Sequence, residues 1–293
     1  MPQTLIHTKR EIRLNGQQVK RKYNAEIATT ISSNDKNAIT KLAMYFTLTL
    51  LGSKNGKLNY LLEVDKRFFL DDVNFIIKNP TKAQQLALKV ATLNDKLVFE
   101  VNPNFKLLQL SNTEEVLNKW KKIKQEIQAE FIDIDDLIND FDWQLQNNIQ
   151  QSFLNDNFYN FFFANVFYKE FENDKPISET KSITNAIGNI DIPVIEQKSI
   201  IKRNVIFSDI TIQTEATIDA EHKKFSLEKL NVFIGDLAET GTQLDLDFKY
   251  KGTYQILPPK GLIINGELTY GVEIGSVYKK TTNMNFNLIQ DEQ

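Results

Sequence analysis

The sequence predicts an α+β protein dominated by β-structure, with antiparallel sheets from its N- and C-terminal thirds and a helical middle segment. Three observations predict this class: long stretches of alternating apolar and polar residues near both ends, Asn-Gly pairs between such stretches, and apolar residues at three- and four-residue spacing in the middle. We expect an N-terminal β lobe with one short helix (1–110), a helical segment (111–175) and a C-terminal β lobe (176–293). Whether the three pack as one unit is left open.

The N-terminal stretch predicts two hairpins. Asn15-Gly16 lies between apolar residues and an alternating series that begins at Val19, and Asn55-Gly56 separates the alternating stretches 42–50 and 58–64. Asn-Gly favours the positive φ values of a type I′ turn, which joins two antiparallel strands. Two hairpins by residue 65 therefore favour an antiparallel sheet.

The next stretch predicts helices around a third hairpin. Asn79-Pro80 is typical of an N-cap followed by proline, which predicts a short helix to about Thr92. Strands are expected over 97–101 and 105–110. Ser111 and Glu114 have the spacing of a capping box, which predicts the start of a longer helix, and a second helical pattern follows from Ile134 to Phe153.

Strand patterns return after residue 176. Residues 210–218 alternate between apolar and polar side chains, and so do residues 244–251. Between them, we expect Phe225, Leu227, Val232 and Ile234 to continue the sheet. Glycines and prolines in the last 40 residues are typical of turns or kinks in strands.

Composition argues against several classes of activity. The net charge is −3 and the chain has no cysteine and two histidines, which excludes disulfides, thiolate chemistry and cysteine-bound metal, and disfavours multi-histidine metal sites and nucleic-acid partners. Glycine-rich phosphate loops and the G-x-S-x-G motif are absent. Asp245 and Asp247 lie on the polar face of a strand pattern, where we expect solvent exposure. We predict no enzyme, no cofactor and no metal.

The chain is also expected to have no transmembrane segment and no signal peptide. Its most apolar run, Phe161–Tyr168, is shorter than the roughly 20 residues that a spanning helix needs. We expect a soluble chain that is cytoplasmic if it is native and full length, and periplasmic or envelope-associated if a signal peptide was removed.

The segment from Phe153 to Phe171 is unusually rich in aromatic residues. Aromatic side chains bury large areas, so the segment is expected to anchor a core or an interface. Three hypotheses compete: packing between two lobes, a surface for a protein partner, and a wall for an apolar ligand. The candidate surface residues are Phe158, Phe161, Phe162, Phe163, Phe167, Tyr168 and Phe171.

One passage carries a resemblance to a known group of proteins. Residues 99–120, FEVNPNFKLLQLSNTEEVLNKW, resemble a strand, turn, strand, Asn and helix passage of uncharacterised β-rich bacterial envelope proteins, often lipoproteins. The resemblance implies a block of strands on either side of a helical middle, and it assigns no activity to particular residues. We expect the chain to depart from the group, because its first residues predict no signal peptide and it has no cysteine for lipidation.

The function expected first is that of a non-enzymatic bacterial protein-binding or scaffold protein in a cell-envelope or secretion assembly. Its partner would be another protein, bound through sheet edges or the aromatic segment. The alternative is a carrier that holds a lipid or other apolar ligand between two curved sheets, with residues 153–171 lining or gating the cavity. A third hypothesis is membership of a multi-protein bacterial machine such as a secretion system, and a hydrolase is a further, less favoured one.

Overall fold

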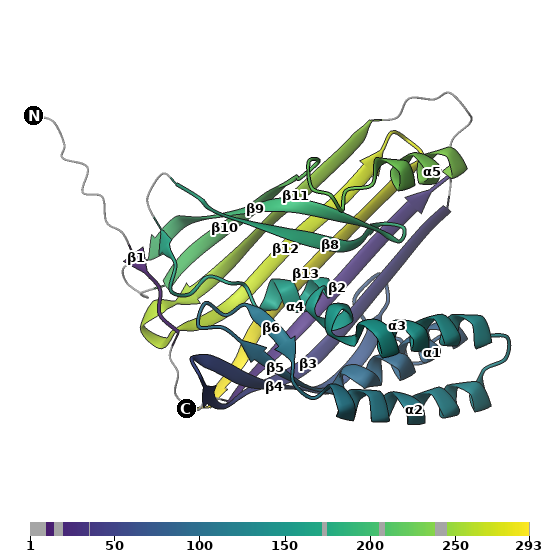
Figure 1. The fold of residues 1–293 in the computed structure, drawn as a ribbon, viewed down its shortest axis with the longest axis horizontal. Helices are drawn as coiled ribbons and strands as arrows, with labels where there is room; N and C mark the ends of the chain where they lie inside the picture. The colour runs from purple at the N-terminus through teal and green to yellow at the C-terminus, as the bar shows by residue number, and fades with distance from the viewer. Residues whose placement is uncertain are drawn as a thin grey trace, which may run out of the picture. The chain divides into compact units, whose positions relative to one another are not determined.

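The computed structural model describes residues 10–14, 20–34, 36–171, 175–204, 209–237 and 245–292. Eleven strands form one sheet in the order β6-β5-β4-β3-β2-β13-β12-β11-β10-β9-β8, and β1 pairs with β7 in a small second sheet. The predicted β-dominated α+β class is confirmed (Figure 1). The helices and strands are β1 (Arg10–Glu11), β2 (Lys20–Ser33), β3 (Lys36–Lys54), β4 (Lys57–Leu70), α1 (Lys82–Ala91), β5 (Lys96–Val101), β6 (Leu107–Leu110), α2 (Thr113–Glu130), α3 (Asp135–Leu154), α4 (Asn157–Phe162), β7 (Glu170–Phe171), β8 (Ile177–Ile187), β9 (Ile190–Asn204), β10 (Asp209–Ile218), α5 (Leu227–Leu237), β11 (Leu246–Leu257), β12 (Leu262–Ile274) and β13 (Tyr278–Glu292), with short 3₁₀ helices at Thr92–Asp95 and Pro258–Lys260.

The chain forms two compact units. Unit 1 comprises Met1–Asn15, Ile27–Ile39 and Asn165–Asn287, and unit 2 comprises Gly16–Glu26, Thr40–Ala164 and Leu288–Gln293. Strands β2, β3 and β13 each contribute residues to both units. The three sequence segments proposed as lobes and helical middle stay a prediction.

Unit 2 is a sheet with helices. Asn55 and Gly56 have φ values of +53° and +75°, and Lys54 pairs with Lys57, so the predicted Asn-Gly hairpin between β3 and β4 is confirmed. Helices α1, α2 and α3 pack together beside β4 and β6 (Figure 1). The apolar stripe of α2 is buried at Val116, Trp120 and Ile123, because residues three and four apart share one helix face.

Helix starts in unit 2 differ from those predicted. Before α1, Thr81 is the N-cap and forms a capping box with Gln84, so the cap lies two residues after Asn79. Before α2, Asn112 is the N-cap and makes no side-chain cap bond, so the predicted Ser111–Glu114 box is wrong. The Asn112 side chain instead accepts a hydrogen bond from the Val98 amide, which ties the helix start to β5. The predicted Asn15-Gly16 turn lies outside the described residues.

Unit 1 is a curled sheet in which β8 lies against β12 as well as pairing with β9 (Figure 1). Hydrogen bonds connect the two sides of the curl. The Gly188 amide at the β8–β9 turn donates to the hydroxyl of Tyr278 on β13, and Lys280 donates to the Asn185 carbonyl. The side chains on the inner face are mostly apolar and buried, among them Ile192, Val194, Ile212, Tyr254, Ile256, Leu268 and Val272.

Residues 227–237 form helix α5, so the prediction that this stretch continues the sheet is wrong. Leu227, Leu230, Phe233, Ile234 and Leu237 recur at three- and four-residue spacing, which favours a helix over the two-residue alternation of a strand. The Phe233 ring packs edge-on against Tyr278, with 5.2 Å between the ring centroids. Gly188 has a φ of +53°, and a Cβ there would come within 2.9 Å of the Phe233 ring, so another residue at this turn would require that ring to shift.

Within the described part of the chain, none of the helices is both long enough and apolar enough to span a bilayer.

Candidate functional site

The candidate site lies in unit 1, where neighbouring strands β10 and β11 part. Their pairing ends at Glu215 and Lys251. Beyond this pair, β10 continues along β9 as far as Ile218, and β11 continues along β12 as far as Leu246. The two strands therefore stay in the sheet through their other neighbours while an opening separates them.

A hollow of about 440 Å³ occupies this opening. Ala216, Phe248 and Tyr250 line it with apolar surface, and Tyr250 is 6% exposed. Charged side chains that point to the outer face of the sheet, including Glu215 and Lys251, form part of its rim. Small-molecule sites commonly have volumes of roughly 300–1,000 Å³, and the volume of this hollow lies in that range. Its lining combines the apolar surface with polar and charged residues, among them Gln197, Thr217 and Lys249.

A group of charged side chains, of which Glu196 and Lys198 are buried and Glu179 and Lys181 half-buried, adjoins the hollow on its inner side. We call Glu179, Lys181, Glu196, Lys198 and Tyr250 the polar cluster. The Tyr250 hydroxyl donates to Glu196 Oε1 at 2.5 Å and accepts from Lys181 Nζ at 2.5 Å, so the cluster contacts a residue that lines the hollow.

The charges of the cluster are paired. Lys181 Nζ lies 2.5 Å from Glu196 Oε1, and Lys198 Nζ lies 2.8 Å from Glu196 Oε2 and 2.5 Å from Glu179 Oε1. Asn165 donates a further hydrogen bond to Glu179 Oε2. Glu196 is only 1% exposed and Lys198 3%. Two ammonium groups and two carboxylates give the cluster a formal charge of zero.

The pKa values of the cluster reflect burial and pairing. Burial by itself would raise the pKa of Glu196, but the two ammonium groups outweigh it and hold this pKa well below its ordinary value. Burial also acts to lower the pKa of Lys198, but the carboxylates of Glu196 and Glu179 raise it above its ordinary value. The pKa of Lys181 is lowered, because its burial outweighs the attraction of Glu196.

Thr214 on β10 adds an unpaired polar atom beside the cluster. The residue is fully buried, and in the described part of the chain its Oγ1 has no hydrogen-bond partner. Thr214 pairs with Lys198 of β9 and with Gly252 of β11. A Cβ on Gly252 would lie 2.8 Å from the Thr214 methyl group and 2.7 Å from the Glu267 carbonyl oxygen, so the glycine permits close packing here.

Charged side chains in a protein interior carry a large desolvation cost. A well-packed apolar replacement of a buried ion pair is often as stable or more stable by ~1–4 kcal/mol, and an unpaired buried hydroxyl costs about 1–3 kcal/mol. The ion pairs are therefore weak evidence that these residues serve stability alone. Their position beside an opening in the sheet makes them candidates for ligand recognition.

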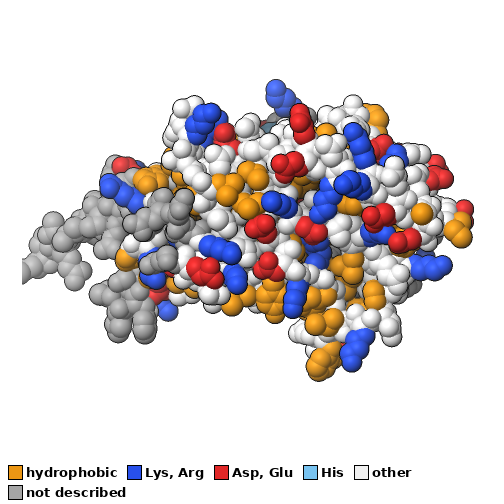
Figure 2. All heavy atoms as spheres, turned by 90° about the horizontal axis from the view of Figure 1, so that it is seen from below, with side chains coloured by type: hydrophobic (Ala, Val, Ile, Leu, Met, Phe, Trp, Pro, Cys, Tyr) orange, Lys and Arg blue, Asp and Glu red, His pale blue; other side chains and the backbone are white. Residues whose placement is uncertain are grey.

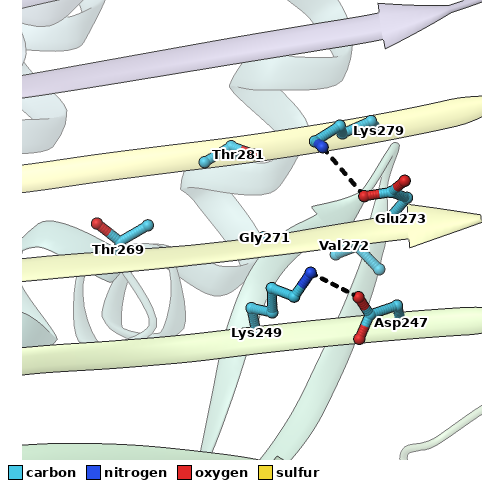
Figure 3. Close-up of a pocket in the computed structure, with 8 residues that line it drawn as sticks. All are labelled: Asp247, Lys249, Thr269, Gly271, Val272, Glu273, Lys279 and Thr281. Carbon is cyan, nitrogen blue, oxygen red and sulfur yellow. Dashed lines mark ion pairs between the residues drawn. The ribbon is translucent and has the colours of Figure 1, made fainter.

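A second hollow, of about 200 Å³, lies on the outer face of β11, β12 and β13 (Figure 3). Lys249 points toward Asp247 and Lys279 toward Glu273, with ion-pair distances of 2.8 and 3.0 Å. All four side chains are more than 40% exposed, so the pairs contribute little to stability. Asp247, which the sequence places on a polar strand face, is therefore a solvent-exposed residue held by Lys249.

The seven aromatic residues predicted to form a binding surface are divided between the two units. Phe158, Phe161, Phe162 and Phe163 are buried in unit 2, where α4 packs its rings on the sheet. Phe162 lies 5.1 Å from the rings of both Tyr23 and Phe46, measured between centroids.

The other three candidates belong to unit 1, where Phe167 and Phe171 are buried and Tyr168 is 40% exposed. The Tyr168 hydroxyl donates to the Leu14 carbonyl. A role of the seven aromatic residues in binding a partner or ligand stays a prediction.

The polar cluster was not predicted from the sequence. Glu196 and Lys198 continue the alternation of Ile192 and Val194 on β9, so they share the buried face of that strand. Charged residues in register with apolar ones are the signal that could have identified them. In the described ranges, no group of three or more histidine, aspartate and glutamate side chains is placed to hold a metal ion.

The surface view shows lysine and arginine side chains interspersed with aspartate and glutamate over the face presented (Figure 2). Such mixing differs from the single-sign basic surface that binds nucleic acid.

Comparisons with known proteins give only weak resemblances. No protein-family profile and no curated protein matches the chain. A structure of lipovitellin, described for its lipid–protein interactions, has a TM-score of 0.48 and 6% identity over 95% of this chain, which spans 26% of that protein.

Two bacterial structures match most of both chains. An outer membrane lipoprotein-sorting protein domain from Vibrio parahaemolyticus has a TM-score of 0.16 and 10% identity, covering 93% of this chain and 85% of its own. A DUF1329 family protein from Desulfovibrio piger has a TM-score of 0.20 and 8% identity, covering 92% and 84%.

Proposed function

We propose that the protein binds an apolar ligand in unit 1, with access through the opening between β10 and β11, and acts as its carrier. The observation that carries this proposal is the parting of two adjacent strands over a hollow whose inner wall contacts a buried polar cluster. The apolar lining would hold a hydrocarbon part, and the polar groups would orient the other end. The lipid interactions named for lipovitellin agree with this class of ligand.

A protein partner is less well supported at this place. A partner strand bound at the parted edges would pair through its backbone and would leave the polar cluster without a role. A ligand that enters the hollow reaches Tyr250, which is bonded to Glu196 inside the sheet. The scaffold function stays a prediction.

The opening can be tested by closing it with a disulfide. The chain has no cysteine, so a double variant Thr217→Cys/Lys249→Cys introduces one defined pair. These positions would face each other if the pairing of Glu215 with Lys251 continued by two residues. A disulfide needs Cα atoms about 4.4–6.8 Å apart, so its formation pulls the parted strands together.

The readout is binding of N-phenyl-1-naphthylamine, a neutral apolar probe whose fluorescence rises in apolar surroundings. We expect the wild type and the reduced variant to bind the probe and the oxidised variant to lose most binding. The matched control is Gln213→Cys/Thr253→Cys, which links the same strands where they already pair. If the oxidised and reduced forms of Thr217→Cys/Lys249→Cys bound the probe equally, the opening would be refuted as the access route.

A second variant covers the case in which the disulfide does not form. Ala216→Trp places a large side chain in the hollow itself, and we expect it to lower probe affinity while the folded state is retained. Native mass spectrometry of the wild type provides a direct check, because a carrier is expected to retain a bound lipid. Unchanged probe binding by Ala216→Trp would contradict the proposed location.

A further inference from the structure

We propose that residues 71–77, which we call the apolar loop, dock unit 2 on an anionic lipid bilayer by inserting Val73, Phe75 and Ile76 into its apolar layer. The loop lies between β4 and α1, and the inference does not depend on ligand binding in unit 1. Three observations carry it: the exposure of the apolar side chains, the hydrogen bonds that hold the loop, and the lysines beside it.

The apolar loop exposes three large apolar side chains within four residues. Val73 and Phe75 are each 70% exposed, and Ile76 is 56% exposed. Single exposed apolar residues are common on protein surfaces, but several together mark a surface that contacts lipid or protein. The three side chains therefore require an occupant that removes them from water.

Asp71 holds the apolar loop in shape. Its Oδ1 accepts hydrogen bonds from the amides of Val73 at 3.0 Å and Phe75 at 2.8 Å. Its own amide donates to the Phe75 carbonyl at 2.9 Å, and its carbonyl accepts from the Asn74 amide at 3.1 Å. Asn74 has a φ of +67°, a left-handed conformation that asparagine tolerates well. The shape of the loop thus does not require its apolar side chains to be buried.

These hydrogen bonds favour lipid as the occupant. A segment that enters the apolar layer leaves water, so its backbone groups need partners within the protein. The amides of Val73 and Phe75, the two most exposed residues of the three, have such a partner in Asp71. Area also favours lipid, because a stable protein interface buries about 800 Å² on each partner, and three side chains fall short even at about 250 Å² each.

Lysines place positive charge beside the apolar side chains. Lys41 Nζ donates to the Asp72 carbonyl at 2.8 Å and to Asn74 Oδ1 at 2.9 Å, which holds an ammonium group against the loop. Lys78 and Lys82 follow the loop, are exposed, and form no ion pair in the described part of the chain. The three lysines outnumber the two aspartates of the loop. Ammonium groups next to apolar side chains match the phosphates that lie above the apolar layer of an anionic bilayer.

The first test is co-sedimentation of the full chain with vesicles of phosphatidylcholine and phosphatidylglycerol. We expect the wild type to sediment with the vesicles and Phe75→Ser to bind about tenfold more weakly, because it loses the burial of an aromatic side chain. The matched control is Leu51→Ser, since Leu51 is 49% exposed at the other end of the β3–β4 pair. We expect it to bind as the wild type does. Both variants should keep the urea midpoint of the wild type, because both side chains are exposed.

The second test removes the charge and keeps the apolar side chains. We expect Lys78→Gln/Lys82→Gln to bind the same vesicles about tenfold more weakly, since each lysine near an anionic surface strengthens binding several-fold. The control Lys54→Gln/Lys57→Gln removes equal charge at the turn between β3 and β4 and should leave binding unchanged. Unchanged binding by the first variant would overturn the preference for an anionic bilayer.

The third test reads insertion directly from one fluorescent label. The chain has no cysteine, so Val73→Cys accepts a single nitrobenzoxadiazole group while Phe75 and Ile76 stay in place. We expect its emission to rise when vesicles are added and to be quenched by phosphatidylcholine that carries a nitroxide on its acyl chain. The same label on Leu51→Cys should show neither response. A label at position 73 that is not quenched would overturn insertion.

The remaining outcomes decide between lipid and other occupants. Absence of wild-type sedimentation with the vesicles, or equal binding by Phe75→Ser, would overturn the proposal. If the wild type associated with itself without vesicles and Phe75→Ser abolished this, a second copy of the chain would cover the loop and the lipid proposal would be wrong. None of these results affects binding of N-phenyl-1-naphthylamine in unit 1, so the two proposals fail separately.

Discussion

The two units bury different chemistry behind similar antiparallel strands. In unit 2, the rings of Phe46, Phe99, Phe162 and Phe163 lie against one another, with Phe99 and Phe163 at a centroid distance of 5.5 Å. In unit 1, the inner face also carries two lysines, two glutamates and Thr214.

The difference distinguishes an interior of packed aromatic rings from one that contains ion pairs, as the proposed ligand-binding function would require. The buried hydroxyl of Thr47 in unit 2 has Asp65 as partner, whereas Thr214 in unit 1 has none among the described residues. Aromatic packing gains free energy from every contact it makes. In the polar cluster, the attraction between paired charges is set against the cost of removing them from water.

The largest effect is expected from Phe162→Ala in unit 2. Phe162 is 1% exposed and touches rings from β2, β3 and its own helix, so its truncation leaves a cavity. We expect a loss of about 3–5 kcal/mol in the free energy of unfolding, measured by urea denaturation. Phe75→Ala is the control, since Phe75 is 70% exposed and should change stability by less than about 0.5 kcal/mol. A small effect of Phe162→Ala would contradict a packed aromatic core.

The next effect is expected from Lys198→Met in unit 1. The change leaves the carboxylates of Glu179 and Glu196 with Lys181 as the remaining ammonium group, so we expect a loss of about 3 kcal/mol. Lys249→Met is the matched control, because Lys249 is exposed and its pair with Asp247 should contribute no more than about 1 kcal/mol. Equal effects of the two variants would mean that the cluster is hydrated like a surface pair.

A smaller effect is expected from alkaline pH in unit 2. Burial raises the pKa of Tyr60 from 10.0 to about 12. The folded state therefore favours the neutral phenol, so its contribution is complete below pH 10 and is lost as the pH rises from 10 to 12. Two pKa units correspond to about 2.7 kcal/mol. Unfolding measured across this range should lose less stability in Tyr60→Phe than in the wild type, and identical profiles would contradict the burial of this phenol.

Local patterns predicted much of the fold. The Asn55-Gly56 turn was predictable because its residue types favour positive φ, and the buried face of α2 was predictable from the spacing of Val116, Trp120 and Ile123. The stretch that forms helix α5 was predicted as strand because a few of its apolar residues, taken alone, also fit the two-residue alternation of a strand. The full set fits the three- and four-residue spacing of a helix. The Asn112 side chain turns to β5 rather than to its own helix, a tertiary contact that local capping rules do not contain.

The candidate site was much less predictable. The alternation of β9 places Glu196 and Lys198 on its apolar face, but their partners Glu179 and Tyr250 come from β8 and β11, which no local pattern brings together. Thr214 carries no motif at all, and its lack of a partner is a property of three neighbouring strands.

The amino-acid sequence by itself determined the alternation of the strands, the stripes of the helices and the absence of cysteine chemistry, because these depend on residues close together along the chain. Only the tertiary structure decided that β10 and β11 part after Glu215 and that a buried polar cluster lies behind the opening. Strand pairing joins residues far apart in sequence, and its register is set by the packing of whole faces rather than by any local pattern.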